Sequence, residues 1–450
     1  MAAKEIALEE NKNMVKKLIN KKAILVIFII FAVASAGISI GRWTVNSVGA
    51  EGEIYEELKL FSEALSLVRK NYVEEVKPKE LIYGSIKGML GSLDPHSSFM
   101  TPEQYKEMQV DTKGEFGGVG IQIGIKDSML TVIAPIEDTP AYKAGIKSGD
   151  KIIKINNDFT KDMSLQDAVS KMRGVPSSTV KITIIREGWK ETRDFTITRE
   201  VIKVKSVKSK TLEDGIGYIK INQFQEQTSS DLAQAMENMS QDNINSLVLD
   251  LRNNPGGLLN SAIDVSGQFL PSGKLVVFIK DKKGEKIEYR SNKNTANSAI
   301  PMVVLVNQGS ASASEIVAGA LKDWNRAVVI GTQTFGKGSV QSVVPLTDGS
   351  ALRLTTAKYY TPKGISIQST GITPDIVVKA EIKNGGKGRP VIREKDLERH
   401  LKNGEDIEEK PSEPEEIIPM EIDEKDDTQL QRAIDLLKTW KVFKELPKAS

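Results

Sequence analysis

Three serines lie within five residues of a stretch that reads "VNQGSASASEIVAGALKD", from Val306 to Asp323. The stretch begins as a loop containing glycine and continues in a pattern typical of a helix, so Ser310, Ser312 and Ser314 lie near the predicted helix start. A serine hydroxyl can act as a nucleophile when a neighbouring base takes its proton. The question is therefore which of these serines has such a base.

The composition restricts the choice of base. The 450-residue chain has two histidines, His96 and His400, and no cysteine. Few histidines are therefore available as the base of a Ser/His/Asp triad. The absence of cysteine excludes a thiol nucleophile, a disulfide framework and a thiolate metal site. With so few histidines we expect no metal centre, and we predict no cofactor. The formal net charge is +2, from 62 basic and 60 acidic residues, so no global field favours nucleic acid as a partner.

A lysine is the alternative base, and Lys337 lies in "GTQTFGKGSVQ". Its amine would be neutral near pH 7 if burial lowered the pKa by about 3 units from about 10.4. The segment imitates a phosphate-binding P-loop, but that motif requires Ser or Thr where Gly338 stands, and a strand pattern follows instead of a helix. We therefore predict that Lys337 is a base and not a nucleotide ligand.

Helix-start rules narrow the choice of serine without settling it. Ser312 precedes Glu315 by three residues, which is the spacing of a capping box and predicts Ser312 as N-cap. There the N–H of Ala313 and the helix dipole would face a developing oxyanion. In the purely structural alternative the hydroxyl only caps the helix. On these arguments Ser310 and Ser312 remain rivals.

Strands and helices alternate after Val204 and must position these groups. Strand-like runs are "GIGYIKIN", "INSLVLDLR", "LVVFI", "PMVVLVN" and "RAVVIG", and "TSSDLAQAMENM" is helical. The alternation predicts a largely parallel sheet with crossover helices, and sites in such sheets gather beyond the carboxyl ends of strands. The segment "LRNNPGGLLN" (residues 251–260), the serine cluster and the Lys337 segment all follow predicted strands.

The residues from Phe116 to Arg199 have an all-β pattern with two short helical stretches. This region resembles a PDZ domain through "FGGVG", which matches the carboxylate-binding loop, and "AGIKSGDKIIKIN". Backbone N–H groups of such a loop can hold a terminal carboxylate, and the adjacent strand edge can accept an added strand. The predicted peptide-binding residues are Phe116, Gly117, Gly118, Val119 and Gly120. Alternatively, the glycines only form a tight turn.

The N-terminal part of the chain predicts a membrane anchor. Residues 23–41 form an uncharged apolar run long enough to span a bilayer, and lysines precede it, which predicts a cytoplasmic N-terminus and an outside location for the rest. Alternatively, "AVASAG" marks the cleavage site of a signal peptide. Amphipathic helices are expected between Glu51 and Tyr83. His96, in "GSLDPHSSFMTPEQY", is expected to make loop hydrogen bonds rather than to act in catalysis.

Four motifs in a fixed order carry a family resemblance: "LDPHSSFMTPEQY", "DLRNNPGGLL", "NQGSASASEIVAGALKD" and "FGKGSVQ". Together with the PDZ-like insert they resemble the carboxyl-terminal processing proteases, also called tail-specific proteases, from about Tyr55 to Ala380. The resemblance implies a serine protease on a crotonase-like α/β core with a Ser/Lys dyad. It assigns Ser312 as nucleophile, Lys337 as base and Gln341 as the residue that orients the lysine.

The resemblance also implies supporting residues. Oxyanion donors would be the N–H of Ala313 and an N–H of the "PGG" turn, from Gly256 or Gly257. Arg173, in "KMRG", matches an arginine that couples the PDZ ligand to the active site in regulated members. Two acidic residues match polar positions that are implicated in some members, Glu315 and Asp323.

The predicted organisation is a multidomain α/β protein with helical segments at both ends. The predicted parts are a basic tail (1–22), the transmembrane anchor (23–41), a helical region with the start of the core (51–112), the PDZ domain (113–203), the protease core (204–380) and a C-terminal extension (381–450). The extension combines an acidic, Pro-containing linker with a final helix, "TQLQRAIDLLKTW". In relatives with a similar end the terminal helices help form a dimer, which predicts a homodimer.

These inferences predict a membrane-anchored extracytoplasmic endopeptidase. It would bind polypeptide substrates by their C-termini through the PDZ domain and cleave them at the dyad. The alternative is a PDZ scaffold on a catalytically silent protease fold. The presence of Ser312, Lys337 and Gln341 together favours the enzyme.

Overall fold

The computed structural model describes residues 54–292, 299–379, 392–403 and 426–445. The chain divides into two units after Ile86. The first unit holds a helix over residues 54–71 and most of α2 (Pro78–Gly91), which confirms that helices form there. Within the described ranges no helix has the length and apolar character needed to span a bilayer. The predicted anchor, residues 23–41, lies outside those ranges.

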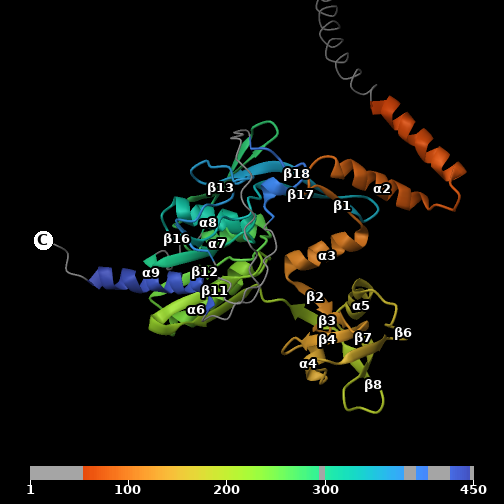
Figure 1. Ribbon diagram of the computed structural model, residues 1–450, viewed down its shortest axis with the longest axis horizontal. Helices are drawn as coiled ribbons and strands as arrows, with labels where there is room; N and C mark the ends of the chain where they lie inside the picture. The colour runs from red at the N-terminus through yellow and green to blue at the C-terminus, as the bar shows by residue number, and fades with distance from the viewer. Residues whose placement is uncertain (1–53, 293–298, 380–391, 404–425, 446–450) are drawn as a thin grey trace, which may run out of the picture. The chain divides into compact units, whose positions relative to one another are not determined.

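The second unit contains a six-stranded sheet in the order β10-β11-β12-β15-β16-β19. Figure 1 labels β11, β12 and β16 of this sheet. Only β10 runs antiparallel to its neighbour, so the predicted largely parallel sheet is confirmed. All residues of β12 and β15 are buried, as expected for continuous apolar runs covered on both faces. The strands are β10 (Val207–Thr211), β11 (Ile216–Ile221), β12 (Ser246–Asp250), β15 (Met302–Val306), β16 (Val328–Gly331) and β19 (Ile376–Val377).

Helices cover both faces of this sheet. Side chains such as Leu249 and Val304 pack with helices α6 to α8 on one face, whereas Val248 and Val303 pack with α9 on the other. The alternation follows from the two-residue repeat of a strand. The helices are α6 (Thr228–Ser240), α7 (Leu259–Ser266), α8 (Ala313–Asp323) and α9 (Thr428–Glu445), with a 3-10 turn η1 (Glu213–Gly215) before β11.

A second, antiparallel sheet packs on the same core and corrects one prediction. The sequence pattern predicts the run "LVVFI" as a strand of the parallel sheet, but it forms β13, which pairs antiparallel with β14 and β18. A buried apolar run indicates a strand without indicating its sheet, and a tight hairpin after β13 directs the chain away from the parallel sheet. The strands are β1 (Ser98–Met100), β13 (Leu275–Asp281), β14 (Lys286–Arg290), β17 (Ser339–Pro345) and β18 (Ala351–Tyr360).

The PDZ-like insert has a hydrophobic core of its own and the predicted strand-rich pattern with two short helices. Its main sheet has the order β3-β4-β5-β7-β8, with β6 beside β5, and β2 pairs with β9 where the chain enters and leaves. Helix α3 (Pro102–Lys113) precedes the insert. The elements of the insert are β2 (Glu115–Gly118), β3 (Ile121–Lys126), β4 (Met129–Pro135), α4 (Pro140–Lys143), β5 (Lys151–Ile155), β6 (Asp158–Phe159), α5 (Leu165–Met172), β7 (Thr179–Ile185), β8 (Arg193–Thr198) and β9 (Glu200–Lys203).

A buried arginine attaches the final helix to the core. Arg252 Nη2 lies 2.6 Å from Asp250 Oδ2 and 2.7 Å from Asp427 Oδ2, and the Tyr218 hydroxyl donates to Asp250 at 2.7 Å. Burial alone would lower the pKa of Arg252, but the Asp250 charge and the hydrogen bonds to both carboxylates raise it. Because Asp427 immediately precedes α9, this ion pair joins the predicted terminal helix to the loop after β12.

We expect Asp427→Asn to loosen α9. The substitution removes the charge that faces buried Arg252, so the local opening free energy should fall by about 2 kcal/mol, or roughly 30-fold in amide protection. Hydrogen exchange of the α9 amides measures the change. Asp435→Asn, on the exposed side of the same helix, is the matched control. Equal protection in both variants would show that the ion pair does not fix the helix.

Candidate active site

The candidate site lies at the carboxyl ends of three adjacent parallel strands. β12, β15 and β16 are neighbours in the sheet, and the three segments singled out in the sequence follow them directly. Hydrogen bonds join these segments: the Ala311 N–H donates to Asn254 O at 3.0 Å, and the Phe335 N–H donates to Ser310 O at 3.1 Å. The predicted meeting of the three segments at one sheet edge is confirmed.

The structure separates the three serines by what their side chains contact. The Ser310 hydroxyl is fully buried, donates to Leu251 O at 2.8 Å and accepts from the Asn307 N–H at 3.0 Å. The Ser314 hydroxyl is also buried and donates to Asn254 O at 2.9 Å. Ser312 alone among the three is partly exposed, at the start of α8. The geometry therefore favours Ser312 over its rival Ser310.

Ser312 has a strained backbone, with φ 53° and ψ −111°. A positive φ is unfavourable for a residue with a side chain, and such strain of about 1–3 kcal/mol clusters at functional sites. The neighbouring turn leaves no room for a larger residue, because a Cβ atom on Gly256 would lie 2.9 Å from the Ser312 Cβ. The "PGG" turn is thus in direct contact with the candidate nucleophile.

Two backbone N–H groups beside Ser312 are available as oxyanion donors. Neither the Ala313 N–H nor the Gly257 N–H donates a hydrogen bond to any residue in the described part of the chain. The Gly256 N–H, in contrast, donates to Asn254 Oδ1 at 2.9 Å. Of the two predicted glycines, Gly257 therefore offers the free donor, while Gly256 provides the close approach to Ser312.

One buried carboxylate, that of Glu315, joins the nucleophile to the base loop. Its Oε2 accepts from the Ser312 N–H at 2.8 Å and from the Lys337 N–H at 3.0 Å. Its Oε1 accepts from the Gly336 N–H at 2.7 Å and from the Thr334 hydroxyl at 2.5 Å. Burial raises the pKa of Glu315 to about 7, and these hydrogen bonds limit the rise. Glu315 thus holds both loops in register.

The amine of Lys337 has the electrostatic environment expected of a base. Desolvation lowers its pKa and the nearby charge of Arg353 adds to that effect, whereas Glu394, Glu315 and Asp94 oppose it. Within the described residues no hydrogen bond joins the side chains of Ser312 and Lys337. In enzymes without substrate, catalytic hydrogen bonds are often loose and tighten in the substrate complex.

The predicted lysine-orienting residue, Gln341, has one free acceptor. Its Nε2 donates to the Thr355 hydroxyl at 2.9 Å, and that hydroxyl in turn donates to Asp94 Oδ1 at 3.1 Å. Because a carboxylate only accepts, this chain fixes the direction of the amide. The Gln341 Oε1 is left buried without a partner among the described residues, which suits it to receive the hydrogen of an ammonium group.

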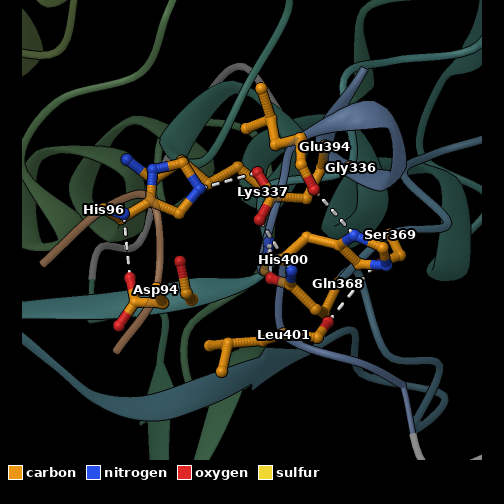
Figure 2. A network of polar contacts seen from close by, with 12 residues as sticks. Asp94, His96, Gly336, Lys337, Gln368, Ser369, Glu394, His400 and Leu401 are labelled. Carbon is orange, nitrogen blue, oxygen red and sulfur yellow. Dashed lines mark hydrogen bonds and ion pairs between the residues drawn. The ribbon is translucent and has the colours of Figure 1, made fainter. Parts of the chain in front are cut away.

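His96 belongs to a different set of contacts. Its backbone N–H donates to Asp94 Oδ1 at 2.8 Å, and its Nε2 lies 2.7 Å from Glu394 Oε2 (Figure 2). Burial opposes the charge of Asp94, but hydrogen bonds from Ser97 and from the N–H of His96 lower the pKa of that carboxyl. The expected role of His96 in loop hydrogen bonding is confirmed.

A groove of about 250 Å³ between β3 and α5 contains most of the predicted peptide-binding residues. Arg173 also lines it, and its guanidinium lies 4.5 Å from the centre of the Phe116 ring. Gly117 does not line the groove, and its carbonyl accepts from the Gly174 N–H at 3.0 Å. The residues of the glycine-rich loop that do line it are Phe116, Gly118, Val119 and Gly120.

Asp323 is not part of the site, which corrects its selection as a supporting residue. It lies at the far end of α8, where its carboxylate accepts from the Lys363 N–H at 2.8 Å. Sequence reasoning assigned no role to Asn254, whose buried amide donates to Ile221 O and accepts from the Gly256 N–H. The pair of asparagines in "LRNNPGG" was the available signal. In the described ranges, no cluster of acidic residues and histidines could hold a metal ion.

The sequence matches three known families along its length. Residues 215–378 match Peptidase family S41, residues 107–185 match the PDZ domain, and residues 35–104 match the Activating protease CtpB N-terminal domain. The structure is similar to that of a photosystem II D1 C-terminal processing protease, with 32% identity and a TM-score of 0.42 over 71% of this chain and 92% of the other.

Curated relatives match most of the chain. The carboxy-terminal-processing protease of Bartonella bacilliformis is 43% identical over 423 residues, which are 93% of this chain and 96% of the relative. The carboxy-terminal processing protease CtpB of Bacillus subtilis is 37% identical over 334 residues, which are 73% of this chain and 69% of the relative. As the four motifs predict, the chain belongs to the carboxy-terminal processing proteases, PDZ-containing serine peptidases of family S41.

Proposed function

We propose that the chain is an endopeptidase that cleaves proteins near their C-termini with Ser312 as nucleophile and Lys337 as base. The observation that carries this proposal is the buried carboxylate of Glu315, which accepts from the backbone N–H of both residues. This shared contact supports the proposal that the partly exposed Ser312 and Lys337, whose pKa is lowered, act on the same substrate. The crotonase-like character of the core stays a prediction.

In the proposed reaction, Ser312 Oγ attacks the scissile carbonyl while the neutral Lys337 amine takes the hydroxyl proton. The N–H groups of Ala313 and Gly257 then stabilise the oxyanion, a contribution of about 10²- to 10³-fold per donor. The Lys337 ammonium, oriented by Gln341 Oε1, returns its proton to the leaving amine. Water hydrolyses the acyl-enzyme by the same proton transfers in reverse order.

The groove beside α5 supports recognition of substrate tails. A free carboxylate would bind the backbone N–H groups of the glycine-rich loop, and the last residues of the tail would add a strand to β3. Phe116 and Arg173 lie at the same end of the groove and would sense its occupant. Recognition would then depend on the terminus, whereas the cut would fall upstream in the chain.

The location and assembly of the enzyme are also proposals. The apolar run of residues 23–41, preceded by lysines, supports a membrane anchor with the catalytic part outside the cytoplasm. A homodimer is supported by the resemblance of the terminal helix to those of dimeric relatives. In this chain Leu430, Ala433 and Leu437 of α9 pack on its own sheet, so Trp440 and Phe443 further along are the exposed candidates for a dimer contact.

The first test of this function is substitution of the dyad. Ser312→Ala and Lys337→Ala should each lower kcat on an unstructured protein by at least roughly 10³-fold, and the double variant should lose little more because the two groups act together. Ser310→Ala and Lys363→Ala are the matched controls. If Ser312→Ala cleaved normally and Ser310→Ala were inactive, the nucleophile would be Ser310 and not Ser312. A wild-type chain that binds tails without cleaving would be a silent scaffold.

The second test concerns the substrate's terminus. A peptide with an amidated C-terminus lacks the charge that the glycine-rich loop would hold, so it should bind more weakly and be cleaved more slowly than its free-acid twin. Fluorescence anisotropy with the Ser312→Ala chain measures binding without turnover, and wild-type kinetics measure cleavage. Equal affinity and equal rates for the acid and the amide would show that the groove does not select free tails.

A further inference from the structure

A segment near the C-terminus contacts the loop that carries the candidate base. We call residues 392–403 the C-terminal strap and residues 335–338 the base loop. The strap lies beyond all three family matches, yet its Glu394 N–H donates to Phe335 O at 3.1 Å. Further along, the Ser369 hydroxyl donates to Leu401 O at 3.3 Å (Figure 2). Lys358 Nζ donates to Lys402 O at 2.6 Å. The strap is therefore bound to the core near both of its ends.

The side chain of Glu394 is fully buried and has two partners. Its Oε2 lies 2.7 Å from His96 Nε2, and its Oε1 accepts from Gln368 Nε2 at 2.8 Å. An ionised carboxylate only accepts, so Gln368 must present its amide hydrogens, and His96 would donate to Glu394 in the tautomer that carries hydrogen on Nε2. A buried carboxylate is unfavourable unless such donors compensate it, which makes this geometry specific.

Gln368 connects Glu394 to the base loop by two hydrogen bonds. Because Gln368 gives its Nε2 hydrogens to Glu394, its Oε1 faces the other way and accepts from the Gly338 N–H at 3.0 Å. The two backbones also approach closely, since a Cβ atom on Gly338 would lie 2.2 Å from the backbone nitrogen of Gln368. Glu394 thus holds the loop before Lys337 through Phe335 and after it through Gly338.

Glu394 is also one of the charges around the Lys337 amine. Desolvation and Arg353 of β18 lower the pKa of Lys337, while Glu394, Glu315 of α8 and Asp94 raise it. His96 lies beside Glu394 and shares its carboxylate. Removing the negative charge of Glu394 would leave Arg353 less opposed, so the ammonium form would be less stable.

We propose that Glu394 is a positioning residue of the active site, which holds the base loop through Phe335 and Gln368 and ties it to the N-terminal segment through His96. The C-terminal strap thereby completes a catalytic centre that the S41 core only partly supplies. The inference rests on the proposed role of Lys337 as the base.

The test is the pH profile of kcat for the full chain carrying Glu394→Gln, with Glu398→Gln on the exposed side of the strap as the matched control. The plateau rate should fall roughly 10- to 100-fold because the base loop is misplaced, with KM nearly unchanged. The acid limb, where Lys337 loses its proton, should move to lower pH. Arg353→Gln should move the limb to higher pH, which checks the sign.

A second variant separates position from charge. Gln368→Met breaks the contact with Gly338 but keeps the Glu394 carboxylate, so the plateau should fall while the limb does not move to lower pH. Hydrogen exchange of the base-loop amides should show lost protection in both variants. The inference is overturned if Glu394→Gln matches Glu398→Gln, or if its rate falls while its limb stays in place.

The same measurements distinguish this inference from the function on which it rests. If Lys337→Ala retains activity, the limb does not belong to Lys337 and both proposals are wrong. If Lys337→Ala and Ser312→Ala are inactive while Glu394→Gln behaves like Glu398→Gln, the dyad stands and only the role of the strap is wrong.

Discussion

The site depends on a buried carboxylate that two loops share. Glu315 comes from the first turn of α8, and its oxygens accept from the backbone of Ser312 on one loop and from Gly336 and Lys337 on the other. Burying a charge is unfavourable unless donors compensate it, and here the donors are the main chains that must be aligned. The same contact that makes Glu315 tolerable in the core therefore sets the register between nucleophile and base.

The surroundings of Lys337 come from distant parts of the chain. Burial and Arg353 favour the neutral amine, and the carboxylates of Glu315, Asp94 and Glu394 oppose them. Asp94 precedes the PDZ-like insert and, through Thr355, directs the amide of Gln341. Glu394 comes from beyond the S41 match. The pKa of Lys337 is therefore set by burial together with charges from segments before and after the S41 match.

Much of this arrangement follows from local sequence patterns. Apolar runs separated by helical stretches were enough to predict the parallel strands, and parallel strands end on one edge, so the three polar segments had to meet. The spacing of Ser312 and Glu315 predicted the helix start. The prediction that β13 belongs to the parallel sheet was wrong, because a buried strand has the same apolar sequence pattern in a parallel and in an antiparallel sheet.

The remaining features depend on contacts between residues far apart in the chain. The Ser310 hydroxyl donates to the Leu251 carbonyl, whereas the Ser312 hydroxyl does not. No local sequence pattern indicates this difference. Asp323 matched by type but lies at the wrong end of a helix. The contact of Glu394 with His96 joins residues that are 298 positions apart in the sequence, so composition and periodicity gave no signal for it.

The central claim is that Lys337 is a neutral base near the working pH, and its amine can be titrated directly. Trace acetylation of the folded Ser312→Ala chain over a pH series, read by mass spectrometry, gives the midpoint for each lysine independently of its accessibility. The account predicts a midpoint for Lys337 below the ordinary value of about 10.4. A midpoint at or above that value would contradict it.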